Sequence, residues 1–172
     1  MIVYKFRMLS DENDHFVRDY DVPATMTLLE LHDFIIDSLD YEPCISSFYT
    51  ADKQWEPLQE YTTVDMGFES EDEQVEAPQT MEKAVLCEIL HYMNDRLIYN
   101  FDLLGNRAFY LELIDAQEGN LPEGYPRESF AHATPPDQYD ADASKQDGSI
   151  FDEMMDDFGG DYGSDDYDAD EY

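Results

Sequence analysis

The sequence predicts an α+β protein: an antiparallel sheet built from two β-hairpins, packed with two helices and followed by a disordered acidic C-terminal tail. Three observations lead to this class. Apolar and polar residues alternate in two pairs of short segments, as they do in half-buried strands. Two segments between these pairs carry apolar residues at helical spacing. Toward the C-terminus the composition changes to acidic and aromatic residues that cannot build a core.

These observations divide the chain into three parts. Residues 1–115 contain every predicted strand and helix and form the α+β domain, with an acidic loop at 65–79. Residues 116–136 are rich in Pro and Gly and are predicted to be a surface extension. Residues 137–172 contain fourteen Asp and Glu, one Lys, and no Leu or Val. This last part is predicted to be a disordered acidic and aromatic tail.

The first hairpin is predicted from alternation on both sides of a polar stretch. Residues 2–9 alternate, and residues 15–22 restart the alternation before Pro23 ends it. We expect the two segments to pair antiparallel. The apolar face of the first strand contains Ile2, Tyr4, Phe6 and Met8, and the other face contains Lys5 and Arg7.

The first helix has the clearest local signal. Thr27 and Glu30 have the spacing of a capping box, and Met26 can form a hydrophobic staple with Leu31. An apolar face that should pack on the hairpin is formed by Leu28, Leu31, Ile35 and Leu39. A hairpin followed by a helix gives the chain a β-grasp-like start.

The middle and end of the domain are predicted from shorter patterns. Residues 45–50 are a strand candidate whose partner contains Trp55, and residues 61–64 are a weaker third piece. A second helix is predicted over residues 81–93 from its broad apolar stripe. The second hairpin joins residues 97–101 to 109–113 through a turn at 103–106.

The charge of the chain limits its partners. The chain has 42 acidic and 9 basic residues; residues 1–136 alone keep 28 and 8, a formal net charge of −20. Direct nucleic-acid binding needs a basic surface, which this composition does not predict. A basic protein, a metal ion or a hydrophobic groove rimmed with Lys and Arg is the expected class of partner. The alternative is that the acidity serves solubility alone.

Cysteine content and hydropathy bear on the compartment. Cys44 and Cys87 are too few for a disulfide framework, and each is flanked by apolar residues, which fits a reducing compartment. The N-terminal residues alternate and do not form a signal sequence, and no apolar run reaches 18 residues. We therefore expect a cytoplasmic protein with no membrane contact.

Several segments together resemble a known family. They are Val17–Pro23, Thr27–Ile35, Trp55-Glu56 and Tyr99-Asn100-Phe101-Asp102. Over roughly residues 1–136 the chain is similar to the plasmid pRiA ORF-three-like family, some members of which are labelled TnpR passengers of insertion elements. The resemblance implies an α+β fold and an origin in bacterial genomes, including mobile elements. It implies no established activity.

No residue pattern predicts catalysis or a cofactor. His32, on the first helix, is interpreted as a packed, hydrogen-bonded histidine, and Cys87 as a small buried hydrophobe. The start of a calcium loop at Asp140 lacks the required Gly and Glu at its sixth and twelfth positions, Lys145 and Phe151. We therefore predict a non-enzymatic protein with no specific metal site and no cofactor.

The tail contains one candidate binding motif. Ser149 and Asp152 have capping-box spacing, and acidic residues crowd the first turns of the predicted helix. The proposed partner-binding face contains Ile150, Phe151, Met154, Met155 and Phe158. Because so short a helix is marginal in water, it would fold only in the groove of a partner. The alternative is that these residues only increase non-specific binding by the tail.

The sequence therefore predicts a protein-interaction module of uncharacterised role. Its acidic tail would bind a protein with a basic-rimmed groove through a short amphipathic helix. A second hypothesis is a nucleic-acid mimic or accessory factor that acts on a DNA-binding protein of a mobile element. An enzyme with an unrecognised site is a third.

Overall fold

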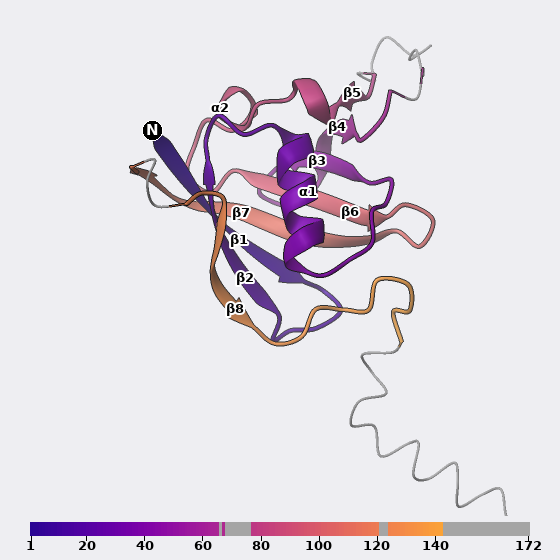
Figure 1. Ribbon diagram of the computed structural model, residues 1–172. Coiled ribbons are helices and arrows are strands. Elements are labelled where there is room, and N and C mark those ends of the chain that lie inside the picture. The colour runs from indigo at the N-terminus through magenta and orange to yellow at the C-terminus, as the bar shows by residue number, and fades with distance from the viewer. Residues whose placement is uncertain (66, 68–76, 121–123, 143–172) are drawn as a thin grey trace, which may run out of the picture.

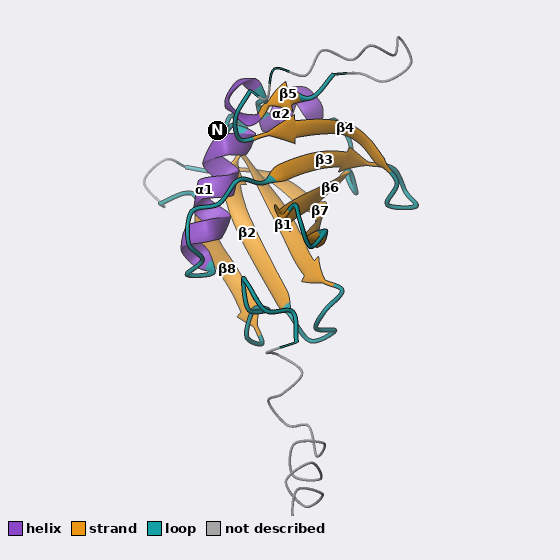
Figure 2. Cartoon of the chain, turned by 90° about the vertical axis from the view of Figure 1, so that its right-hand side faces the viewer, coloured by secondary structure: helices purple, strands orange, loops and turns teal. Residues whose placement is uncertain are grey.

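A single mixed β-sheet organises the protein (Figures 1 and 2). The structure, a computed structural model, describes residues 1–65, 67, 77–120 and 124–142. Within these ranges the sheet has eight strands, in the order β5-β4-β3-β6-β7-β1-β2-β8. One long helix, α1, packs on one face of the sheet (Figure 1). The predicted α+β class is therefore confirmed, with a larger sheet and less helix than we expected.

Neighbouring strands pair antiparallel, except that β4 and β5 are parallel. The strands are β1 (Ile2–Ser10), β2 (Val17–Pro23), β3 (Ser47–Ala51), β4 (Pro57–Thr62), β5 (Gln79–Thr80), β6 (Arg96–Asp102), β7 (Arg107–Glu118) and β8 (Arg127–His132). The helical segments are α1 (Leu28–Ser38), the 3₁₀ turn η1 (Met81–Lys83) and the single-turn α2 (Leu86–Ile89).

The helix α1 begins where the sequence predicted. The Thr27 hydroxyl accepts a hydrogen bond from the Glu30 amide at 3.2 Å, and the Glu30 carboxylate accepts one from the Thr27 amide at 2.8 Å. Both halves of the capping box are therefore present, which satisfies two of the amides that a helix start leaves without partners. The expected apolar face of Leu28, Leu31, Ile35 and Leu39 is buried in the core.

The second helix predicted over residues 81–93 is wrong. Only η1 and α2 are helical there, because the backbone of this segment bonds to the chain that leads into α1. The Leu28 amide donates to the Ala84 carbonyl at 2.8 Å, and the Leu86 amide donates to the Met26 carbonyl at 2.9 Å. These bonds replace helical i→i−4 bonds.

Cys87, expected to be buried, is exposed.

Two further segments differ from the sequence analysis. Trp55 lies in the turn between β3 and β4 and not in the partner strand of β3. Residues 116–136, expected to be a surface extension, supply the end of β7 and all of β8, which pairs with β2. The strand β1 pairs antiparallel with β2 on one side and with β7 on the other. Residues 66 and 68–76 of the predicted acidic loop lie outside the described residues.

Candidate functional site

The predicted partner-binding residues lie outside the described residues. They are Ile150, Phe151, Met154, Met155 and Phe158. The structure does describe the chain that leads to them, as far as Asp142. Residues 137–139, which we expected to belong to the disordered tail, contact the domain. We call these contacts, made by residues 136–139, the anchor.

Arg107, the first residue of β7, is the centre of the anchor. Its guanidinium forms an ion pair with Glu12, with Nη2 and Oε1 2.9 Å apart. It also donates hydrogen bonds to the carbonyl groups of Asp137 at 2.6 Å and Gln138 at 2.9 Å. The face of the guanidinium lies 4.9 Å from the ring centre of Phe101. Only 9% of the Arg107 side chain and 15% of the Glu12 side chain are exposed, so this planar fork of donors is nearly saturated by protein groups.

The loop after α1 holds the other side of the anchor. The Glu42 amide donates to the side-chain carbonyl of Gln138 at 2.7 Å, and the Gln138 side-chain amide donates back to the Glu42 carbonyl at 2.8 Å. The Tyr41 hydroxyl donates to the Pro136 carbonyl, and the Tyr139 hydroxyl donates to the Glu42 carboxylate. Burial raises the pKa of Tyr41, so its hydroxyl stays a donor at neutral pH. The chain therefore leaves the domain at a fixed place.

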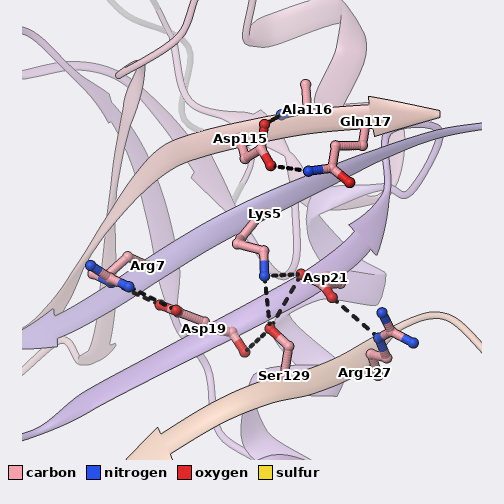
Figure 3. Close-up of polar contacts among 9 residues, drawn as sticks. All are labelled: Lys5, Arg7, Asp19, Asp21, Asp115, Ala116, Gln117, Arg127 and Ser129. Atoms are coloured by element: carbon pink, nitrogen blue, oxygen red, sulfur yellow. Dashed lines mark hydrogen bonds and ion pairs between the residues drawn. The ribbon is translucent and has the colours of Figure 1, made fainter. Parts of the chain in front are cut away.

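The face of the sheet opposite α1, which we call the open face, carries two rows of paired charges. Figure 3 shows the first row and the Arg7–Asp19 pair of the second. The first, the Lys5 row, crosses four strands in register. Its centre is the buried Asp21 carboxylate, which lies 3.2 Å from Lys5 Nζ, 3.2 Å from Arg127 Nε and 3.2 Å from the Ser129 hydroxyl. The row contains Asp115, Lys5, Asp21 and Arg127. A depression of about 270 Å³ lies at this end of the face, between the row and Tyr125.

The second row, the Arg7 row, lies beside the first. Arg7 donates two hydrogen bonds of 2.9 Å to the two carboxylate oxygens of Asp19, and Arg96 Nε lies 3.4 Å from a carboxylate oxygen of Glu112. The row contains Arg96, Glu112, Arg7 and Asp19. Across the two rows four cations face four carboxylates. The two rows are therefore charge-balanced in a domain whose formal charge is strongly negative.

A third polar cluster is buried under α1. His32 is 5% exposed, and its Nδ1 lies 2.6 Å from the Tyr99 hydroxyl and 2.9 Å from the Ser46 hydroxyl. Burial lowers the pKa of His32, and the neighbouring Asp33 carboxylate opposes this shift only in part. Burial likewise raises the pKa of the Cys44 thiol, which disfavours the nucleophilic thiolate. His32 is therefore a packed, hydrogen-bonded residue, as the sequence indicated.

The described residues lack two further features. No group of three or more His, Cys, Asp or Glu side chains within residues 1–65, 67, 77–120 and 124–142 is arranged to hold a metal ion. No helix in those ranges is both long and apolar enough to span a membrane.

Sequence reasoning missed the anchor, because its contacts join residues about 30 to 97 positions apart. One signal was present. Arg107 is an isolated cation directly after a turn in a strongly acidic chain, so several acceptors compete for it. The sequence does not show which of these acceptors it binds.

The fold and these contacts define a class: a small α+β protein whose sheet has one helix-covered face and one open face, with an acidic C-terminal segment anchored to the domain. The sequence profile of the plasmid pRiA4b ORF-3-like protein matches residues 3–144. The chain belongs to this family, and the match includes the whole anchor. The family resemblance drawn from the sequence is confirmed.

A solved structure is similar in fold. It is the crystal structure of MM3350, a protein of unknown function from Methanosarcina mazei Go1, with a TM-score of 0.64 and 17% sequence identity. The similarity covers 95% of this chain and 84% of that chain. At this identity the likeness shows the fold alone. Comparison with curated proteins finds no match.

Proposed function

We propose that this chain is a non-enzymatic protein-interaction module whose domain anchors an acidic tail and whose tail binds a protein partner with a basic-rimmed groove. Ile150, Phe151, Met154, Met155 and Phe158 would be the buried residues of that contact. The observation that carries the proposal is the anchor, because a tail that served only solubility would need no fixed origin on the domain.

The anchor limits where the motif can reach. Ile150 lies eight positions after Asp142, the last described residue. A fully extended chain of this length spans at most about 26–29 Å. A partner that also touches the domain would therefore meet the motif at a high effective concentration, which raises affinity without any new contact.

The alternative is a nucleic-acid mimic that acts on a DNA-binding protein of a mobile element. The formal net charge of −33 supports this alternative, because a phosphate surrogate depends on its carboxylates. The two proposals predict opposite rankings of the same variants, since charge and apolar content lie on different residues of the tail.

The test starts with a pull-down that uses the whole chain. The partner it finds is then titrated with the Phe151→Ala, Phe158→Ala double variant and with the Asp165→Asn, Asp166→Asn, Asp168→Asn triple variant, at two salt concentrations. The groove proposal predicts that the aromatic variant loses most of the affinity and that the charge variant loses little. The reverse ranking, with a steep salt dependence, would support mimicry. Equal losses would contradict both in their simple form.

We also propose a cytoplasmic location. Neither Cys44 nor Cys87 forms a disulfide, which is the usual state of thiols in a reducing compartment.

A further inference from the structure

The open face carries an apolar stripe next to the Arg7 row. The strand register places five side chains side by side across β3, β6, β7, β1 and β2, since Ile98 pairs with Tyr49 and Tyr110, and Leu9 pairs with Tyr110 and Val17. The stripe contains Tyr49, Ile98, Tyr110, Leu9 and Val17. Leu9 is 42% exposed, and the other four are partly buried. α1, η1 and α2 contribute their buried residues to the core on the opposite face, so no helix in the described part of the chain covers the stripe.

Trp55 adds a large aromatic ring to this stripe. Its ring meets Tyr110 edge to face with the ring centres 5.3 Å apart, and the Arg96 guanidinium lies over it at 4.5 Å. Trp55 has a backbone φ of 63°, a left-handed conformation that strains a bulky residue. The turn enforces this conformation, because the Asp52 carboxylate accepts hydrogen bonds from the amides of Gln54 and Glu56. Backbone strain that the surrounding turn maintains at Trp55 supports a functional role for this residue.

We propose that the apolar stripe and Trp55 bind a cationic amphipathic helix of a separate protein. The net charge of the domain favours a cationic partner over the other possible partners of this surface. The chain's own acidic tail and a second copy of the chain are both strongly negative, and they would be repelled by a domain with a formal charge of −20. A cationic helix would instead be attracted over a long range.

The charges around the stripe support the same occupant. On one side the stripe is bordered by the Arg7 row, whose charges balance. On the other side the stripe is bordered by carboxylates, because Glu60 accepts a hydrogen bond from the Tyr49 hydroxyl at 3.1 Å and Asp11 lies 3.5 Å from the Tyr110 hydroxyl. A helix with an apolar face and one Lys- or Arg-rich edge would place that edge along the carboxylate side.

The length of the stripe sets the length of the helix. Four strand spacings separate β3 from β2, which makes the stripe about 19 Å long. A helix rises about 1.5 Å per residue, so about 13 residues would cover the stripe. This surface is distinct from the tail motif, and the inference does not depend on the proposed function.

Trp55 provides the assay, because it is the single Trp of the chain. The probe is a synthetic 14-residue peptide of Leu and Lys with Leu at helical spacing, added to the whole chain. The matched probe has the same composition in an order that gives no apolar face. We expect a saturable shift of Trp55 emission with the first probe and binding at least about tenfold weaker with the second.

Matched variants locate the contact. Leu9→Thr keeps a strand-forming residue at the stripe, while Leu104→Thr changes a fully exposed Leu in the β6–β7 turn. We expect the first variant to weaken probe binding on the order of fivefold and the second to leave it within about twofold. The circular dichroism spectra of both variants establish that each is folded.

Four outcomes would overturn the proposal. In the first, both probes bind equally, which would indicate a charge effect alone. In the second, Leu9→Thr binds the probe as tightly as the unchanged chain. In the third, the emission shift is lost in the Phe151→Ala, Phe158→Ala variant, which would place the contact on the tail. A concentration-dependent emission shift with dimers in sedimentation, and no probe binding, would assign the stripe to a second copy of the chain.

Discussion

Replacing Arg107 by Gln should both destabilise the domain and release the base of the tail. The substitution keeps a hydrogen-bonding side chain but removes the positive charge and the fork of donors. Glu12, with only 15% of its side chain exposed, then loses its ion-pair partner. Two carbonyl groups, those of Asp137 and Gln138, lose their donors.

The expected cost follows from this burial. Removing one partner of a buried ion pair costs about 3–5 kcal/mol, because the other charge is left without compensation. Glu12 is near the surface, and water can partly replace the guanidinium. We therefore expect the free energy of unfolding, measured by urea denaturation, to fall by about 3 kcal/mol, the lower end of that range.

Arg127→Gln is the matched control. The Arg127 side chain is 45% exposed, and its partner Asp21 keeps Lys5 and the Ser129 hydroxyl when Arg127 is removed. The control should therefore cost less than about 1 kcal/mol. A double-mutant cycle with Glu12→Gln separates the ion pair from the two bonds to the carbonyl groups.

Amide exchange at Glu42 reports on the anchor itself. This amide donates to the Gln138 side chain, so its protection depends on Gln138 staying in place. In Arg107→Gln we expect faster exchange at Glu42, while amides in the centre of β1 stay protected under native conditions. The reasoning fails if Arg107→Gln costs no more than Arg127→Gln, or if stability falls with no change in exchange at Glu42.

Three further predictions concern the domain. Truncating the fully buried Leu31 to Ala should lower the free energy of unfolding by about 2–5 kcal/mol. The same change at the partly buried Leu29 should cost clearly less, and equal costs in urea denaturation would contradict the observed helix phase. Burial holds the pKa of folded His32 below 6.5, so the unfolded chain binds the proton first as the pH falls. The contribution of neutral His32 to the free energy of unfolding is fully present above about pH 6.5. Below that pH the free energy of unfolding falls, by up to about 1.4 kcal/mol per pH unit. His32→Asn, measured from pH 7.5 to 5.5, should reduce that slope. Finally, moderate NaCl should raise the melting temperature, because it screens repulsion in a domain with a formal charge of −20, and a flat or falling trend would show that local ion pairs dominate.

Short-range sequence patterns predicted the features of the fold that depend on neighbouring residues. The start of α1 follows from the Thr27–Glu30 capping box, and its buried face follows from apolar spacing. The prediction of a second helix over residues 81–93 failed because apolar periodicity does not show where backbone groups form hydrogen bonds. Val85 forms a bridge with Thr27, and this long-range pairing interrupts a helix that the apolar spacing favours.

The same limit applies to β8 and to the candidate site. Residues 127–132 are all exposed, so they lack the apolar alternation that reveals a strand, yet they complete the edge of the sheet beside β2. Alternation did place Lys5 and Arg7 on the polar face of β1. Their partners depend on the register between strands, which shifts at Lys5/Phe6 and brings Asp115 opposite Lys5.

The open face shows why register matters for function. Of the eight basic residues in residues 1–136, Lys5, Arg7, Arg96 and Arg127 lie on this one face, although they are scattered along the sequence. Each is opposite a carboxylate, so the two rows carry no net charge while the rest of the domain stays negative. An apolar stripe can then remain partly exposed beside the Arg7 row without like charges crowding around it. Net charge read from the sequence predicts which partners are attracted from a distance, but only the paired strands show where such a partner could make contact.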